Sequence, residues 1–124
     1  MHVLRQMLDG VRPGGVVLDL QVIRPNPRVV VAGRTLCEID GEPLFRTADA
    51  ATAAIDALIA AGRLVEQAVD DHDVIRHYET GADLVDDFAG KPRKLPGEAL
   101  ARLRVFGQPC ALRERCRLRR LSVP

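Results

Sequence analysis

A proline and two glycines, Pro13-Gly14-Gly15, separate a helical pattern from a nearly continuous apolar run at Val16–Ile23. Proline cannot continue a helix, and glycine reaches the backbone angles that a reversal into a strand requires. Only Asp19 and Gln21 interrupt the apolar run, which is typical of a strand buried on both faces. This succession predicts an α/β fold in which the other elements cover or extend the strand at Val16–Ile23.

The size and charge of the chain limit what it can be. Its 124 residues, of which 47% are hydrophobic, suit one domain (1–124) with its own core. Lys and Arg number 18 against 17 Asp and Glu, which gives a formal net charge of +1. This charge is too small to attract nucleic acid or an anionic membrane. No apolar run reaches the roughly 18 residues of a membrane span, and no secretion signal is recognisable. We therefore expect a cytoplasmic domain without membrane contact.

The first half of the chain contains two helical patterns and a hairpin. Before the Pro-Gly-Gly turn, one face of a helix carries the apolar side chains Val3, Leu4, Met7, Leu8 and Val11. Val29–Val31 and Arg34–Ile39 flank Ala32-Gly33, which predicts a β-hairpin. The alanine-rich run Ala48–Ala61 predicts a helix capped by Thr47 and Gly62.

The second half predicts two long strands separated by two short helices. A strand at Arg63–Glu79 contains the acidic run Asp70–Asp73, which indicates a bulge or a turn. Thr80 and Asp83 are spaced to cap a short helix. Lys91–Leu95 is expected to be a loop, and Pro96 to lie in the first turn of the next helix.

The last predicted strand, Cys110–Val123, alternates apolar residues with arginines at 113, 115, 117 and 119. One interpretation is a basic stripe that binds nucleic acid, but no aromatic residue is interleaved with the arginines to stack on bases. We consider a nucleic-acid partner the weaker interpretation. The acidic segment Glu66–Asp73 is instead predicted to pair antiparallel with Arg113–Arg120, because opposite charges on neighbouring strands stabilise the pairing.

The three cysteines, Cys37, Cys110 and Cys116, lack the paired close spacing of a metal site. On one strand Cys110 and Cys116 would lie about 20 Å apart, at ~3.3 Å per residue, which is too far for a disulfide. We expect buried thiols and no bound metal.

The segment Leu8-Asp9-Gly10-Val11-Arg12-Pro13-Gly14-Gly15-Val16-Val17-Leu18 resembles part of the class I S-adenosylmethionine-dependent methyltransferases. It corresponds to their late helix, Leu-x-Pro-Gly-Gly turn and fifth strand, with Val11 in place of the usual leucine. A crossover helix, a sixth strand and a final strand that forms an antiparallel hairpin with the sixth follow in that family. The resemblance implies a partial Rossmann-like three-layer sandwich, with a parallel pair of strands, an antiparallel C-terminal strand and an inserted β-hairpin.

The family binds its cofactor through elements that precede the fifth strand, chiefly a glycine-rich loop and an acidic residue. Here Gly14-Gly15 precedes a strand instead of a helix, so it offers no such loop. The resemblance therefore implies the C-terminal half of a methyltransferase, truncated or split, that is not active alone. It would need no cofactor by itself and S-adenosylmethionine only if a partner supplies the N-terminal half.

Four residues are candidates for a substrate pocket, without an assigned catalytic role: Arg24 and Asn26, beyond the end of the first strand, and His77 and Tyr78, in the second long strand. His77 and Tyr78 should point to opposite faces of a regular strand. The acidic run at Asp70–Asp73 is expected to be a solvated loop and no metal site.

The outer edge of the strand Val16–Ile23 predicts a homodimer or a partner chain. In the resembling fold this strand lies between the final strand and the fourth, and the fourth has no counterpart here. An unpaired apolar edge is normally covered or blunted, and a second copy could cover it. Alternatively, the hairpin at Arg28–Ile39 folds back over the edge and leaves a monomer. Two other functions stay open: a small oligomerising or ligand-binding module, and a nucleic-acid accessory that uses the arginine strand.

Overall fold

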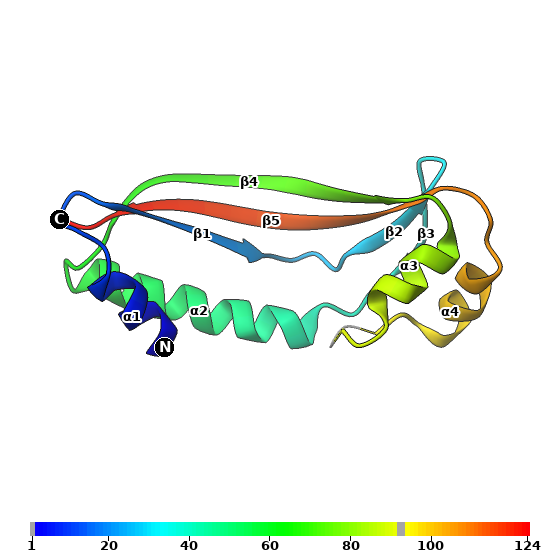
Figure 1. Cartoon of the computed structure of the whole chain (residues 1–124), viewed down its shortest axis with the longest axis horizontal. Coiled ribbons are helices and arrows are strands. Elements are labelled where there is room, and N and C mark those ends of the chain that lie inside the picture. Colours follow the sequence, from blue (N-terminus) through cyan, green and yellow to red (C-terminus); the bar gives the residue numbers. More distant parts are fainter. Residues whose placement is uncertain (1, 92–93) are drawn as a thin grey trace.

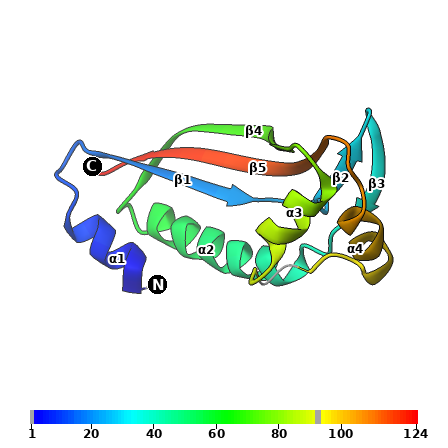
Figure 2. The ribbon, with the colours of Figure 1, turned by 45° about the vertical axis from the view of Figure 1, so that its right-hand side comes forward.

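The computed structural model describes residues 2–91 and 94–124, which form four helices and five strands. Figure 1 shows an elongated molecule in which the helices lie on one side of a long β-ribbon, and Figure 2 shows the same from another angle. The elements are α1 (His2–Asp9), β1 (Val16–Val22), β2 (Arg28–Val31), β3 (Arg34–Glu38), α2 (Glu42–Ala60), β4 (Val65–Tyr78), α3 (Gly81–Phe88), α4 (Gly97–Arg104) and β5 (Cys110–Ser122). The predicted loop Lys91–Leu95 contains residues 92 and 93, which lie outside the described part.

Strand β5 is the centre of the sheet. Along one edge it pairs with β4 over almost its whole length, and along the other edge it pairs first with β2 and then with β1. Strand β3 extends the sheet beyond β2. Every pairing between the described strands is antiparallel. Strands β1 and β4 therefore run in the same direction, with β5 between them.

The predicted α/β class is correct, but the Rossmann-like parallel arrangement is not supported. No parallel pair forms among the described strands, because β5 returns between β1 and β4 and takes the hydrogen bonds of both. The helices also do not form layers on two sides of the sheet, since both views place them on the same side of β4 and β5 (Figures 1 and 2). The antiparallel C-terminal strand and the inserted hairpin are both confirmed.

Two hydrophobic clusters hold the molecule together, one at each end of β5. The first joins β2, α3, α4 and the start of β5, and its buried members are Val29, Ile39, Leu84, Phe88, Leu103, Cys110 and Leu112. The second joins α1, β1, α2 and the end of β5, and its buried members are Leu8, Val17, Ile55, Leu64 and Leu121. Leu112 and Leu121 belong to opposite faces of β5, because side chains alternate along a strand. The twist of the long strand turns each face toward the helices at its own end.

Only one face of β1 is buried, so the prediction of burial on both faces is wrong. Val17 is 6% exposed, whereas Leu18 and Leu20 on the other face are 61% and 57% exposed. An apolar run predicts burial whether or not the chain supplies the covering layer, and no described element covers this face. In α1, Leu8 is buried but Met7 is exposed, and the side chains of residues 2–5 lie outside the described part.

Helix α2 begins at Glu42, six residues before the predicted start. Pro43 suits the first turn of a helix, and the side chain of Asn26 accepts a hydrogen bond from the Gly41 N–H (3.1 Å). Thr47 lies inside the helix and is not its cap; its hydroxyl donates to the Pro43 carbonyl. Gly62, with φ +74°, follows the last turn as predicted.

The remaining elements follow their local signals closely. The bulge in β4 lies between Glu66 and Ala68 and not within the acidic run Asp70–Asp73. Thr80 caps α3 by accepting a hydrogen bond from the Asp83 N–H (3.2 Å), as predicted, and Pro96 directly precedes α4. Within the described residues, no helix is both long and apolar enough to cross a membrane.

Candidate functional site

A groove beside the β2–β3 turn has a volume of about 340 Å³, which is enough for a small ligand. It lies at the carboxyl end of β4, beside the amino end of the antiparallel strand β5. Three strands and the hairpin turn line it, through Val30, Ala32, Gly33, Ile75, His77, Tyr78, Pro109, Cys110, Ala111 and Arg113. Most of these residues are apolar, which suits a small and largely apolar ligand.

Among the ionisable residues that line the groove, His77 and Arg113 belong to the face of the sheet that the groove occupies. His77 is exposed, and its register partner in β5 is Ala111. The Arg113 Nε–H donates to the Asp73 carboxylate at 2.8 Å, which fixes the guanidinium at the rim. The groove therefore combines a mostly apolar lining with the His77 imidazole and the guanidinium of Arg113, whose charge Asp73 offsets. It can bind a small apolar molecule that carries a hydrogen-bond acceptor.

The hairpin turn beside this groove holds an alanine in the left-handed region. Ala32 has φ +49° and Gly33 has φ +77°, the signs that a two-residue type I′ turn requires. Alanine in this conformation costs about 1–2 kcal/mol relative to the right-handed one. The pairing of β2 with both β3 and β5 holds the turn in place and so keeps the groove wall fixed.

Tyr78 uses the other face of β4. Its hydroxyl donates to the Asp87 carboxylate of α3 at 2.5 Å, and Arg76 and Lys91 contact the same carboxylate at 3.2 Å. Burial, and then the hydrogen bond with Asp87, raise the pKa of the Tyr78 phenol above its usual value of 10. The hydrogen bond from Tyr78, and then that from Lys91, lower the pKa of Asp87. This cluster anchors α3 to β4.

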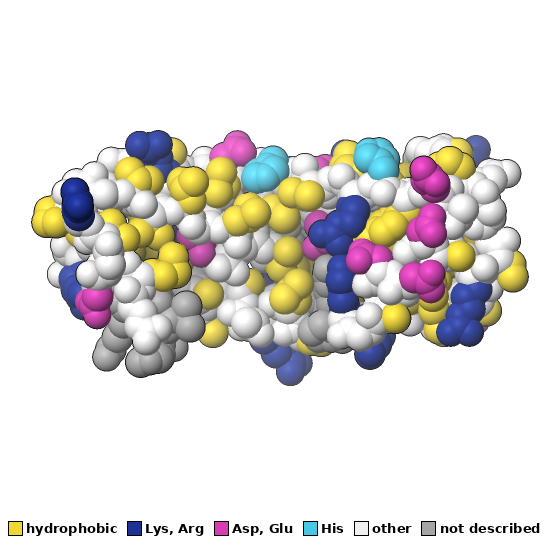
Figure 3. Space-filling model, viewed as in Figure 1, with side chains coloured by type: hydrophobic (Ala, Val, Ile, Leu, Met, Phe, Trp, Pro, Cys, Tyr) yellow, Lys and Arg dark blue, Asp and Glu magenta, His cyan; other side chains and the backbone are white. Residues whose placement is uncertain are grey.

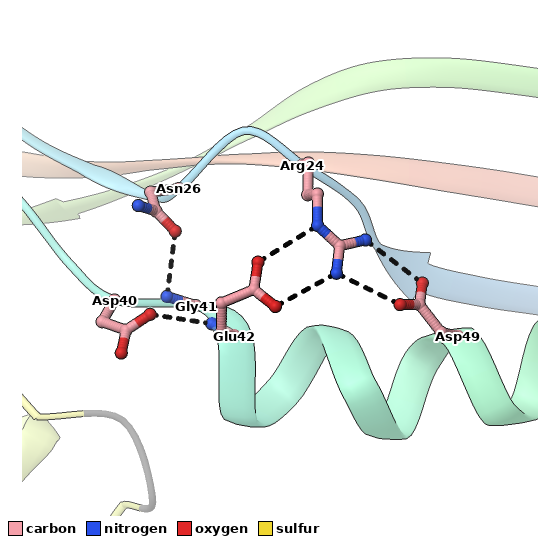
Figure 4. A network of polar contacts seen from close by, with 6 residues as sticks. All are labelled: Arg24, Asn26, Asp40, Gly41, Glu42 and Asp49. Carbon is pink, nitrogen blue, oxygen red and sulfur yellow. Dashed lines mark hydrogen bonds and ion pairs between the residues drawn. The ribbon is translucent and has the colours of Figure 1, made fainter.

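Arg24 and Asn26 bind the N-terminal half of α2. Figure 4 shows the Arg24 guanidinium between the carboxylates of Glu42 and Asp49, with contacts of 3.1–3.3 Å to both. The guanidinium also lies 5.0 Å from the centre of the Phe45 ring. Asn26, on the same link, binds the Gly41 N–H. Both residues tie the β1–β2 link to α2.

The four sequence-predicted residues therefore fall into three places. Of the four, only His77 has its side chain on the face of β4 that the groove occupies, while the Tyr78 side chain points toward α3. Arg24 and Asn26 share a separate network at the start of α2. The structure confirms that His77 and Tyr78 lie on opposite faces, and it does not bring the four together.

The predicted pairing of the acidic and basic segments is confirmed. The β4–β5 register places Asp73 opposite Arg115 and Asp71 opposite Arg117. Arg117 makes two hydrogen bonds to Asp71 (2.8 and 2.9 Å), and Asp73 binds both Arg113 and Arg115. These hydrogen bonds lower the pKa of both aspartates, through Arg117 at Asp71 and chiefly through Arg115 at Asp73.

Arg119 continues this row into the protein interior. Its side chain is 7% exposed and lies between Asp56 of α2 and Glu66 of β4, at 2.9 and 2.6 Å. Two carboxylates compensate the burial of one guanidinium, as a buried charge requires. The arginine row is thus paired with carboxylates, which leaves little positive charge for a phosphate backbone.

The cysteine thiols and the Gly41 junction do not have the features of a reactive or cofactor-binding position. Cys110 and Cys116 are buried, and burial raises the pKa of the Cys37 and Cys110 thiols, which disfavours a reactive thiolate. Within residues 2–91 and 94–124, no three His, Cys, Asp or Glu side chains are grouped to hold a metal. Gly41 precedes α2, but a Cβ there would lie 2.6 Å from the Phe45 ring, so the junction is filled and cannot cradle a cofactor.

Sequence reasoning missed most of the groove. The groove is also lined by Ile75 of β4 and by Ala111 and Arg113 of β5. Neighbouring residues in the sequence do not determine the exact register between these two strands. The available signal was the Ala32-Gly33 turn, which marks a hairpin tip, together with the predicted β4–β5 pairing. Comparisons of the chain with family models, with curated proteins and with solved structures give no match in any of the three.

Proposed function

We propose that this chain is the C-terminal half of a class I methyltransferase fold, truncated or split, which acts with a cofactor-binding half carried elsewhere. One observation carries the proposal: β5 lies between β1 and β4 and is antiparallel to both, with α2 as the connection from β1 to β4. The resemblance of the Pro-Gly-Gly segment implied this order for the fifth, final and sixth strands.

The groove beside the β2–β3 turn suits the methyl acceptor in this proposal. It lies at the carboxyl end of β4, and its His77 and Arg113 can orient a polar group of the acceptor. The cofactor-binding half would pair with the outer edge of β1 and cover the exposed side chains of Leu18 and Leu20. Within residues 2–91 and 94–124, no glycine-rich loop precedes a helix to hold the nucleoside, so in this proposal S-adenosylmethionine would bind only to the assembled pair.

The first prediction tests this proposal by calorimetric titration. The chain alone should bind S-adenosylmethionine no more tightly than about 100 μM, or roughly −5.5 kcal/mol. The DNA that precedes the Met1 codon would be searched for a reading frame that encodes a glycine-rich loop, and that product co-expressed with the chain. The pair should associate and bind the cofactor. Tight binding by the chain alone, or a purified pair that binds none, would overturn the proposal.

A ligand-binding module complete in one chain is the second candidate, because the groove is formed entirely by residues of this chain. Binding of a small apolar carboxylate to the chain alone, with shifts of the His77 and Ala111 NMR signals, would favour it. The nucleic-acid alternative is not favoured, since Arg113, Arg115, Arg117 and Arg119 contact carboxylates.

A further inference from the structure

The outer edge of β1 carries unpaired backbone groups. β1 is the last strand on its side of the sheet, and none of the described strands continues beyond it. The Ile23 N–H donates to the Arg115 carbonyl (2.9 Å) and the Val123 N–H to the Gly15 carbonyl (3.0 Å). Odd-numbered residues of β1 therefore face β5. Because backbone groups alternate along a strand, the N–H and C=O groups of Val16, Leu18, Leu20 and Val22 point outward.

This edge lacks the protection that the other long edge has. The outer edge of β4 carries a bulge at Glu66–Ala68 and the acidic run Asp70–Asp73, both of which discourage pairing with a second copy. β1 is regular, and its exposed face carries Leu18 and Leu20. Figure 3 shows hydrophobic side chains gathered over the part of the molecule where β1, β5 and β4 run side by side. The β2–β3 hairpin pairs with β5 and leaves the β1 edge uncovered.

We propose that two copies of this chain pair β1 with β1, antiparallel, about a two-fold axis at Leu20. Leu20 then lies opposite its own counterpart, and Leu18 lies opposite Val22 of the partner subunit. All three residues direct their backbone groups outward, so each of these pairs exchanges both backbone hydrogen bonds. The leucines form one apolar row across the exposed face, and the sheet continues through both subunits.

The side chains on the other face of β1 select this register. Asp19 Oδ2 is buried and has no hydrogen-bond partner among the described residues, while the Gln21 amide donates to Asp19 Oδ1 at 2.8 Å. An amide nitrogen has a second N–H. With the axis at Leu20, Gln21 lies opposite the partner's Asp19, so an amide with a second N–H faces a carboxylate. An axis at Asp19 would oppose two carboxylates, and an axis at Leu18 would leave Asp19 opposite the partner's Val17, which has no donor.

This dimer uses the same edge that the proposed function assigns to the cofactor-binding half, so the two occupants exclude each other. The dimer is therefore the form of the chain on its own. Its test uses this chain without cofactor or second half. A failure of the dimer leaves the proposed function as it stands, and a failure of the cofactor titration leaves the dimer as it stands.

The second prediction is that light scattering coupled to gel filtration will give a dimer for the chain at about 100 μM, in the affinity range expected of a short strand pair. Leu20→Pro should give a folded monomer, because it removes an outward N–H and spares the β1–β5 ladder. Val69→Pro is the matched control, since the alternation along β4 also directs its N–H to an outer edge. A wild-type monomer, or a dimer that survives Leu20→Pro, would overturn the proposal.

The register is tested by exchanging the two polar groups. Gln21→Glu alone should weaken the dimer about tenfold or more. On each side of the axis the new glutamate would face the partner's Asp19, and like charges on opposite residues destabilise a strand pair. Asp19→Asn combined with Gln21→Glu restores an amide opposite a carboxylate and should return the dissociation constant to within a few fold of wild type. Circular dichroism verifies that both variants fold. A dimer that Gln21→Glu leaves unchanged would rule out the axis at Leu20.

Discussion

The contacts of single residues explain why two of the predicted pocket residues use their polar groups within the protein. Tyr78 donates its hydroxyl to Asp87, and Asn26 accepts from the backbone of Gly41. A tyrosine or an asparagine near the end of a strand signals a ligand site and a structural hydrogen bond equally well. The choice between them depends on which element folds against the residue, which its neighbours in sequence do not determine.

The third prediction concerns the ionisation of Tyr78, the sole tyrosine in a chain without tryptophan. Because burial and Asp87 raise its pKa, absorbance at ~295 nm should show a titration midpoint above 10 in the folded protein and near 10 in urea. Since the folded pKa is the higher one, the stability that Tyr78 contributes is complete below pH ~10 and is lost as the pH rises through the folded pKa.

The variant Asp87→Asn provides the control for that titration. It removes the neighbouring negative charge and should lower the midpoint toward 10, while the contribution of burial remains. Equal midpoints in the folded and the unfolded protein would contradict the assigned hydrogen bond.

Among the elements, β4 and β5 form the longest pairing, and charge sets its register. The apolar pattern of β4 is imperfect and all but two of its residues are exposed. The side chains of Asp71 and Asp73 meet arginines of β5 at 2.8–3.1 Å. Since β4 buries little apolar surface, these ion pairs are the main side-chain contacts that specify how it aligns.

The fourth prediction is that reversing Arg115 and Arg117 to Glu will lower the melting temperature by a few degrees at low salt. The new carboxylates would face Asp73 and Asp71, and like charges opposite each other destabilise a strand pair. The loss should shrink near 1 M salt, because exposed charges are screened. Arg120→Glu is the control, since Arg120 contacts the uncharged Gln67 (2.8 Å). An equal loss at both salt concentrations would contradict an electrostatic cause.

The elements that could be predicted from the sequence are those with local signals. The alternation of β5, the Thr80 cap and the Ala32-Gly33 turn all depend on neighbouring residues. The start of α2 was predicted six residues too late although it has local signals, because Pro43 suits a first turn and the Asp40 side chain accepts from the Glu42 N–H (3.1 Å). The acceptor for the Gly41 N–H, in contrast, comes from Asn26, which lies fifteen residues upstream. The exposed face of β1 could not be predicted, because Leu18 and Leu20 have the same hydrophobicity whether or not a layer covers them.

At the scale of the whole molecule, β5 connects two clusters that share no buried residue. Leu112 and Leu121, both completely buried, belong to different clusters but to the same strand. Strand β5 has hydrogen-bonded partners on both edges. If one end of β5 separates from its cluster, the hydrogen bonds that continue toward the other cluster are disturbed as well. We therefore expect the two ends to unfold together.

The fifth prediction tests this coupling with Leu121→Ala. This substitution should lower the free energy of unfolding by about 2–5 kcal/mol, as removing buried side-chain atoms from a core does. Tyr78 packs against the other cluster, so its fluorescence reports on the opposite end of the molecule. The fluorescence and far-UV circular dichroism transitions should coincide in this variant. Val105→Ala, at a side chain that is 85% exposed, should change stability by less than about 0.5 kcal/mol. A fluorescence transition above the dichroism transition would show that the ends unfold separately.

The central place of β5 also has a consequence for synthesis on the ribosome. β1 and β4 each pair with β5 and with no other described strand, and β5 follows them in the chain. Until the codons for Cys110–Ser122 have been translated, the only strand pair that can form is the β2–β3 hairpin. The apolar run of β1 therefore leaves the ribosome long before the strand that protects it. During that interval its accessible edge is a site for chaperones, or for another nascent chain on the same messenger RNA.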